Sequence, residues 1–159
     1  MSTLTPRRRS LLAAALLACA PWLAQAAPGP YDEAADARAE LQAALAQRQD
    51  ARPLLLVFGA NWCGDCKVLD MAFKQGAAAP LIAKEFRVLK VDVGRFTKHL
   101  DLAEQYGVNL KKGIPAVAVL SPQGQPVYVT RAGELADARH MGDQAIYDFF
   151  AKVVAGGGR

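Results

Sequence analysis

A five-residue apolar run, Leu54 to Phe58, leads directly toward the sequence Trp62-Cys63-Gly64-Asp65-Cys66. A run of this length, bounded by Pro53 and Gly59, is typical of a strand that is buried on both of its faces. The residues that follow, Cys66 to Lys74, mix apolar and charged side chains in a pattern that suits a helix. The sequence therefore predicts that two cysteines lie where a buried strand ends and a helix begins.

The rest of the chain alternates between predicted helices and strands. We expect helices over 31–49, 66–74, 80–85, 96–106 and 141–154, a loop over 108–113, and strands over 54–58, 86–93, 116–120 and 126–130. Met71 and Phe73 are expected to pack in the core. A turn over 121–125 joins the last two strands into an antiparallel hairpin, whereas the earlier strand–helix–strand units require parallel pairing. The predicted fold class is α/β, with a central mixed sheet of about four strands flanked by helices on both faces.

Residues 1–26 have the features of a signal peptide. Arg7 to Arg9 form a positive region, Leu11 to Ala20 an apolar one, and Ala24-Gln25-Ala26 a small-x-small cleavage pattern. The apolar stretch is shorter than the roughly 18–20 residues that a spanning helix needs. We expect cleavage after Ala26 and a periplasmic location. The alternative is a lipid anchor on Cys19, which would be the expected membrane contact; the general and the twin-arginine export routes both stay open.

The predicted domain limits follow from breaks in the sequence, and the expected partners follow from its charge. Pro28-Gly29-Pro30 marks a break in the chain, and we expect a linker and helix over 27–52, one folded domain over 53–155 and a flexible tail over 156–159. The net charge is +4, but three arginines in the first 26 residues leave 16 basic and 15 acidic residues after cleavage. This balance gives no reason to expect nucleic acid as a partner, and we expect a monomer.

The two cysteines that would remain after cleavage, Cys63 and Cys66, are suited to chemistry, because a bridge closing so short a loop adds little stability. Cysteine attacks as its thiolate, and the free N–H groups and positive end of a helix favour that anion. Cys66 could then resolve a mixed disulfide formed at Cys63. The chain has no second pair of zinc ligands and no flavin or nicotinamide motif, so we expect neither metal nor cofactor.

The segment Val57 to Lys67 resembles the thioredoxin family, and so do Lys90-Val91-Asp92-Val93 and Ile114-Pro115. The resemblance covers roughly 52–154 and implies a thioredoxin fold. It also implies that Cys63 is the exposed attacking cysteine and Cys66 the more buried resolving one. Trp62 would pack beside the disulfide, Pro115 would follow a cis peptide bond, and Ile114 would offer backbone hydrogen bonds to a substrate chain.

The sequence departs from the family at the position of a buried aspartate that moves protons for the second cysteine, where this chain has Val57. Asp70, one helical turn after Cys66, is a candidate substitute, and an acid at that spacing resembles the reductase domain of the membrane disulfide-reducing system. The other interpretation is that Asp70 is a solvated helix residue. Lys90 could tune the site in the same way, or it could be a surface lysine.

A second departure is Gly64-Asp65, where thioredoxins carry Gly-Pro. A negative charge on Asp65 would repel the Cys63 thiolate by about 1 kcal/mol after screening, so the pKa of the Cys63 thiol should rise. Destabilising the thiolate favours the disulfide and makes the dithiol a better reductant. We therefore predict a potential of about −250 mV, nearer to thioredoxin than to a strong oxidant.

These features predict a periplasmic thiol–disulfide oxidoreductase that reduces disulfides in protein substrates and draws electrons from an upstream redox protein. The alternative is a thioredoxin-like binding or chaperone module whose cysteines do not turn over. The intact Trp-Cys-x-x-Cys and Ile-Pro sequences favour the enzyme.

Overall fold

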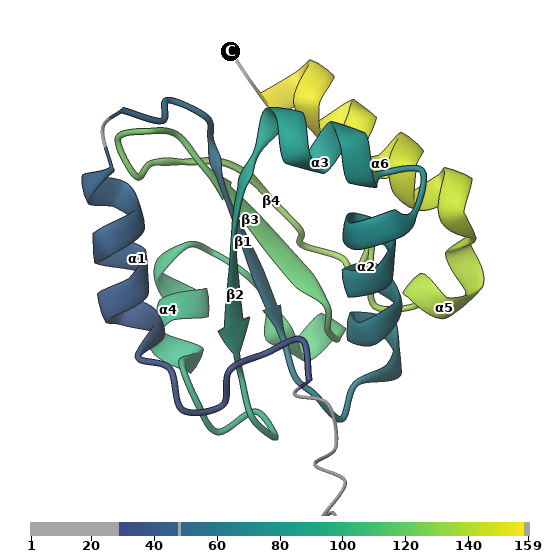
Figure 1. The fold of residues 1–159 in the computed structure, drawn as a ribbon. Helices are drawn as coiled ribbons and strands as arrows, with labels where there is room; N and C mark the ends of the chain where they lie inside the picture. Colours follow the sequence, from purple (N-terminus) through teal and green to yellow (C-terminus); the bar gives the residue numbers. More distant parts are fainter. Residues whose placement is uncertain (1–28, 48, 158–159) are drawn as a thin grey trace, which may run out of the picture.

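A computed structural model describes residues 29–47 and 49–157 of the chain. In chain order its elements are α1 (Ala37–Ala46), β1 (Leu54–Gly59), α2 (Gly64–Gln75), α3 (Ala79–Glu85), β2 (Arg87–Asp92), α4 (Leu100–Gln105), η1 (Leu110–Lys112), β3 (Ala116–Leu120), β4 (Pro126–Val129), α5 (Ala138–Met141) and α6 (Asp143–Gly157). The strands form one four-stranded sheet in the order β2-β1-β3-β4 (Figure 1). The predicted α/β class with a mixed central sheet is confirmed.

The sheet brings segments that are far apart in the sequence together at one end of its strands. Strand β1 is parallel to β2 and antiparallel to β3, and β3 forms the predicted hairpin with β4. The parallel register pairs Gly59 with Asp92 at the carboxyl ends of β1 and β2. Because β3 is antiparallel to β1, its first residue, Ala116, pairs with Phe58 at that same end of the sheet. The residues just before β3 and just after β1 therefore meet.

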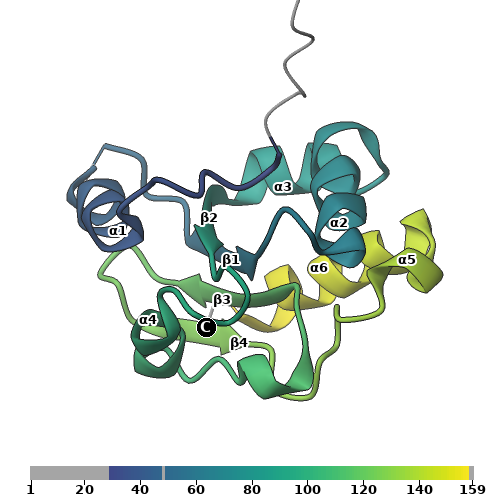
Figure 2. The same ribbon diagram turned by 90° about the horizontal axis from the view of Figure 1, so that it is seen from below.

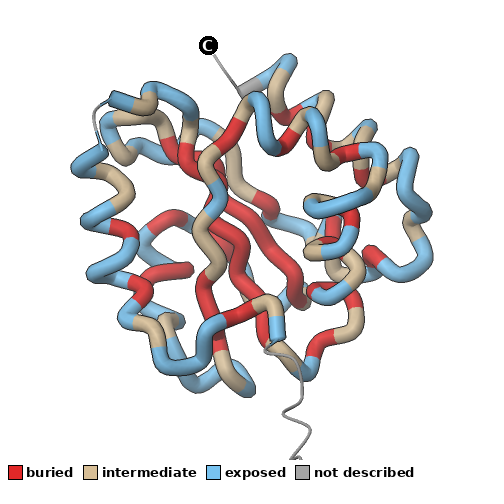
Figure 3. The backbone as a smooth tube through the Cα atoms, in the orientation of Figure 1, coloured by how far each residue is buried: buried red, intermediate tan, exposed pale blue. Residues whose placement is uncertain are grey.

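Two apolar layers hold the helices on the sheet, because successive side chains of a strand point to opposite faces. Leu54, Leu56 and Phe58 pack with residues of α1 and α4, and Leu55 and Val57 pack with residues of α2, α3 and α6. Figure 2 shows α1 and α4 apart from α2, α3 and α6. All six residues of β1 are buried, as its apolar run predicts, and the central strands β1 and β3 are coloured as buried in Figure 3.

The first helix is shorter than the predicted range of 31–49. It begins at Ala37, where the carboxylate of Asp36 accepts hydrogen bonds from the backbone N–H groups of Arg38 and Ala39. Such a cap satisfies donors that the helix itself cannot. Residues 29–36 instead run as an irregular segment that buries Tyr31 (3% exposed).

The predicted helix over 96–106 is also too long. Phe96 and His99 have positive φ values of 59° and 52°, which a right-handed helix does not allow, and α4 starts only at Leu100. Three smaller differences remain. The predicted loop over 108–113 contains η1, and the predicted strand over 126–130 ends at Val129. The short helix α5 precedes the predicted helix over 141–154.

One core prediction is wrong. Met71 is 54% exposed on the outer side of α2, whereas Phe73 packs edge-on against the fully buried Phe150 of α6, with ring centroids 5.0 Å apart. The two residues lie two positions apart on a helix, so they cannot share a face.

Helix α6 continues through Gly157, so it includes the first two residues of the predicted tail over 156–159. The predicted signal peptide and Cys19 lie outside the described residues. In residues 29–47 and 49–157, none of the helices combines the length and the apolarity that crossing a bilayer requires.

Candidate functional site: a CxxC centre at the sheet edge

Cys63 and Cys66 form a disulfide at the start of α2. Both side chains are buried: Cys63 is 5% exposed and Cys66 is 1% exposed. Cys63 is therefore the more exposed of the two cysteines, but it is less exposed than the resemblance implied. The bridge closes over a single helical turn, so it joins residues that the helix already holds together.

Cys63 occupies the N-cap position of α2, with extended backbone angles. Its Sγ accepts a hydrogen bond from the backbone N–H of Cys66 at 3.1 Å. This is the interaction by which a helix start stabilises an anion, since the first N–H groups of a helix have no partner within it. The site can therefore hold negative charge on the sulfur of Cys63 when the bridge is open.

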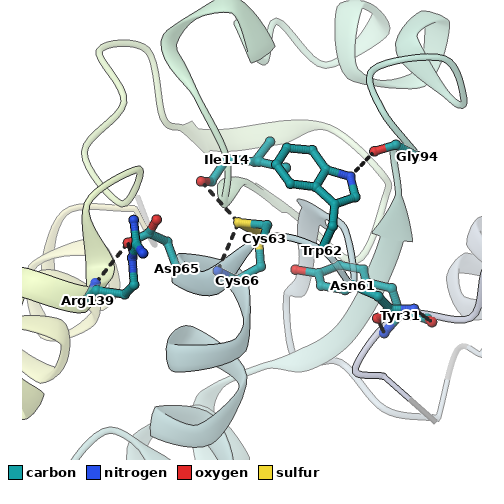
Figure 4. The surroundings of a disulfide bond; sticks show 9 residues. All are labelled: Tyr31, Asn61, Trp62, Cys63, Asp65, Cys66, Gly94, Ile114 and Arg139. Atoms are coloured by element: carbon teal, nitrogen blue, oxygen red, sulfur yellow. Dashed lines mark hydrogen bonds and ion pairs between the residues drawn. A yellow bond between two sulfur atoms is a disulfide. The ribbon is translucent and has the colours of Figure 1, made fainter. Parts of the chain in front are cut away.

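The segment before β3 faces this sulfur. The Ile114–Pro115 peptide bond is cis, as the resemblance implied, and the carbonyl oxygen of Ile114 lies 3.6 Å from Sγ of Cys63. Figure 4 shows Ile114 and Cys63 directed toward each other from opposite sides of the site. Because Pro115 has no N–H, it cannot donate a competing hydrogen bond there.

Trp62 lies at the surface beside the disulfide and is 47% exposed. Its Nε1–H donates to the carbonyl oxygen of Gly94 at 2.8 Å (Figure 4), and its ring contacts Phe96 at 6.0 Å between centroids. The guanidinium of Arg95 lies 5.7 Å from the centre of the Trp62 ring. The loop after β2 therefore holds the indole in place while about half of the Trp62 side chain stays exposed.

Asp65 lies in an environment that its sequence position does not reveal. It is 7% exposed, and its Oδ1 accepts hydrogen bonds from the backbone N–H of Arg139 at 3.0 Å and from the Nε of Arg139 at 3.1 Å. Burial alone would raise the pKa of Asp65, but the hydrogen bonds and charge of Arg139 outweigh it and lower that pKa. The guanidinium also packs over Gly64, where a Cβ would lie 3.2 Å from the Cδ of Arg139. The predicted repulsion of the Cys63 thiolate omits this compensating positive charge and is therefore too large.

Asp70 is neither free nor solvated. Its side chain is 11% exposed and forms ion pairs with Lys90 of β2 and, at 2.8 Å, with Lys74. Burial would raise the pKa of Asp70, yet the two lysines outweigh it and lower that pKa. Lys90 is paired in register with Val57, so its side chain projects from the sheet toward α2. The Asp70–Lys90 pair therefore joins α2 to the edge strand next to the cysteines.

Sequence reasoning missed an N-terminal segment that lies across the site. The side-chain oxygen of Asn61 accepts from the backbone N–H of Tyr31 at 2.9 Å, and its amide donates to the carbonyl oxygen of Tyr31 at 2.8 Å and to Glu33 at 2.9 Å. These contacts hold residues 29–33 against the segment before Trp62 (Figure 4). An asparagine just before Trp62 was the one signal in the sequence, and nothing in the pattern of residues identified its partner.

Comparisons with known proteins agree with this geometry. A family model described as thioredoxin-like matches residues 35–122. The crystal structure of a disulphide isomerase from Xylella fastidiosa Temecula1 is 50% identical and covers 80% of this chain and 98% of that chain, with a TM-score of 0.76. The protein disulfide-isomerase of Gallus gallus is 43% identical over 68 residues, which are 42% of this chain and only 12% of that protein.

A more distant likeness is the oxidised C-terminal domain of DsbD from Neisseria meningitidis, which is 26% identical and covers 72% of this chain and 94% of that chain, with a TM-score of 0.45. This similarity is too remote to support an argument about this protein. The family model spans more than half of the chain, so the protein belongs to the thioredoxin-like family. Its Cys63–Cys66 pair and its similarity to disulfide isomerases support thiol–disulfide oxidoreductase activity.

Proposed function

We propose that this protein is a periplasmic oxidoreductase that reduces disulfides in polypeptide substrates. The observation that carries the proposal is the N-cap position of Cys63, whose sulfur accepts the Cys66 N–H and faces the Ile114 carbonyl. A helix start that stabilises a thiolate is what an attacking cysteine needs, and a second cysteine on the same turn is what resolution needs.

In the proposed reaction the thiolate of Cys63 attacks one sulfur of a substrate disulfide and releases the other as a thiolate. The thiolate of Cys66 then attacks Cys63, which forms the protein disulfide and releases the second substrate thiolate. Two electrons pass from the dithiol to the substrate, and an upstream redox protein returns them. No cofactor enters this sequence of steps.

The supporting residues have proposed roles that follow from their positions. The backbone of Ile114 would pair with a substrate chain, and Pro115 would keep that surface free of a competing N–H. Trp62 would cover the disulfide, and Gly64 leaves room for Arg139, which compensates Asp65. The lowered pKa of Asp70 makes it a weak proton acceptor, so we propose that Asp70 and Lys90 position α2 on the sheet.

An apolar groove beside the site suits a polypeptide substrate. The groove has a volume of about 820 Å³ and is lined by Phe96, Leu100, Val108, Leu110 and Gly113, among others. It reaches two residues that flank Cys63, because its lining residue Phe96 contacts Trp62 and its lining residue Gly113 directly precedes Ile114. A peptide lying there would bury apolar surface that the free protein exposes.

Reduction of insulin by the protein, with glutathione or dithiothreitol as electron source, tests the activity. Wild type should accelerate it, and Cys63→Ser should abolish the acceleration. Equal rates for the two would favour the alternative of a binding or chaperone module without redox turnover. A redox titration against glutathione tests the direction of electron flow, and a potential of about −150 mV or above would contradict a reducing role.

The groove and the location need separate tests. Leu100→Glu should weaken insulin reduction while leaving reduction of a small aromatic disulfide unchanged, and Val127→Glu, at an equally exposed position on β4, serves as the control. Fractionation of cells should recover the protein in the periplasm. If a Cys19→Ser change moves it from membrane to soluble fraction, the lipid-anchored alternative is correct.

A further inference from the structure

Three basic residues beside the apolar groove have no acidic partner in the part of the chain that the structure describes. They are Arg95, Lys111 and Lys112, and all three are exposed. By contrast, Arg139 on α5 is already paired with Asp65. The charges of the three residues are therefore available to a molecule that binds at the site.

The position of Arg95 is defined by two aromatic neighbours. It directly precedes Phe96, which lines the groove, and its guanidinium lies over the Trp62 ring, 5.7 Å from the ring centre. Trp62 directly precedes Cys63, and its indole N–H is bonded to the carbonyl oxygen of Gly94. A chain that crosses the exposed indole to reach the sulfur would therefore pass close to this positive charge.

Lys111 and Lys112 belong to the segment before β3. Both lie in η1, and Lys111 is one of the residues that line the groove. The side chain of Asn109 caps η1 by accepting the backbone N–H of Lys111 at 3.2 Å, which holds this turn in place. Ile114, whose carbonyl oxygen faces Cys63, comes two residues after Lys112. These two charges therefore lie on the same segment that faces the attacking sulfur.

Negative charge at the groove is smaller. Among the described residues that line it, Glu104 of α4 is the one acid, and it is exposed. Asp101 of the same helix is paired with Arg38. Glu33 accepts the amide of Asn61 and does not line the groove. Three positive charges against one negative charge leave a local excess of two, although residues 27–159 as a whole have 16 basic and 15 acidic residues.

We propose that the preferred substrates are polypeptides with acidic residues beside the disulfide, and that Arg95, Lys111 and Lys112 select them. An apolar side chain of the substrate would enter the groove while its carboxylates approach the three cations. The apolar lining suits a polypeptide, which carries apolar and acidic side chains together, better than a polyanion without apolar groups. Single exposed ion pairs add little affinity, but a local excess of charge speeds association and disfavours partners of the same sign.

The acidic preference rests on the proposed function, and three matched peptides separate the two. Each peptide contains one disulfide and one leucine, and two positions beside the disulfide are both glutamate, both glutamine or both lysine. The reduced protein, freed of other reductants, is mixed in excess with each peptide, and acid stops the reaction so that reduced peptide can be measured. Two electrons pass from the Cys63–Cys66 dithiol to the peptide disulfide. Each rate is divided by the rate with dithiothreitol alone, which corrects for the intrinsic reactivity of the peptide.

At about 10 mM salt, the glutamate peptide should be reduced roughly tenfold faster than the lysine peptide, with the glutamine peptide between them. The ratio should fall towards one at about 1 M salt, where screening limits the interaction to about 3 Å. If the protein reduces none of the three peptides, the proposed function itself fails. If it reduces all three at equal corrected rates, the function stands and the acidic preference is overturned.

Charge variants identify the residues that are responsible. Replacing both lysines, Lys111→Gln with Lys112→Gln, should lower the ratio between the glutamate and lysine peptides about threefold or more, and Arg95→Gln should act in the same direction. Glu104→Gln should raise the ratio, because it removes the opposing charge. The corrected rate for the glutamine peptide should stay nearly constant in all of these variants. Lys152→Gln, at an exposed lysine of α6, is the matched control and should leave the ratio unchanged.

Two further results would overturn the inference. One is a ratio that none of the groove variants changes, since the preference would then arise elsewhere. The other is a dimer in sedimentation that Leu100→Glu dissociates, because a second copy of the chain would then occupy the groove in place of the substrate.

Discussion

Arg139 of α5 donates two hydrogen bonds, from its backbone N–H and from Nε, to the same oxygen of Asp65 in α2. The two residues are 74 positions apart in the sequence. The contact places a compensating cation beside the one acidic residue of the CxxC motif. The charge felt by Cys63 is therefore that of the pair, and it cannot be obtained from Asp65 alone.

Removing the positive charge of Arg139 should leave the negative charge of Asp65 uncompensated. In a Cys66→Ala background, Arg139→Gln should raise the pKa of the Cys63 thiol, because Asp65 is then uncompensated, and should slow alkylation of Cys63 at about pH 7 roughly three- to tenfold. Adding Asp65→Asn should restore the wild-type rate, since the double variant again has no net charge there. Slow alkylation in both variants would show that Arg139 acts by packing instead of by charge.

Acid should destabilise the protein through Asp65 and Asp70. Burial opposes ionisation of both carboxyls, but their cationic partners outweigh it and lower both pKa values in the folded chain. Each therefore stabilises the fold above its unfolded pKa of about 3.9 and loses that contribution as the pH falls through its lower folded pKa. Urea unfolding of the reduced protein between about pH 7 and pH 2 should show stability falling below about pH 4.

The contribution of Asp70 to this pH dependence can be measured with the variant Asp70→Asn. Asp70→Asn should be less stable than wild type at neutral pH, because Lys90 keeps its partly buried charge without a partner, and the gap should narrow in acid. A gap that stays constant with pH would mean that the ionised form of Asp70 contributes nothing.

Asn61 should contribute to stability out of proportion to its size. Asn61→Ala removes the bonds to both backbone groups of Tyr31 and to Glu33, and it leaves polar groups of a partly buried segment unpaired. We expect a loss of about 2–3 kcal/mol in the free energy of unfolding. Asn109→Ala is the control, since Asn109 is exposed and its side chain caps only the short helix η1, and it should cost no more than about 1 kcal/mol.

Phe150 should be among the most sensitive core positions. It is fully buried on α6 and contacts three aromatic rings edge-on, those of Phe73, Phe86 and Phe149. Phe150→Ala should cost about 3–5 kcal/mol in urea unfolding. Met71→Ala, at an exposed position of α2, should stay within about 0.5 kcal/mol, and a larger loss there would mean that Met71 is covered in solution.

Several features followed from local sequence because their causes are local. The apolar run of β1 between Pro53 and Gly59 and the turn before β4 each carry their own signal, and both appear as predicted. The limits of helices were less accurate, since they depend on side chains such as the Asp36 cap and on the positive φ of His99. These conformations are set by contacts that an average propensity does not include.

The sequence by itself determined the chemistry of the site: two cysteines two residues apart at the end of a buried strand, with an Ile-Pro pair further along. Only the tertiary structure decided the charges around those sulfurs. Arg139 compensates Asp65, two lysines pair with Asp70, and the N-terminal segment brings the hydroxyl of Tyr31 to the space beside Cys66. The physical reason is that strands and turns depend on near neighbours along the chain, whereas an electrostatic environment depends on every group within several ångströms, whatever its position in the sequence.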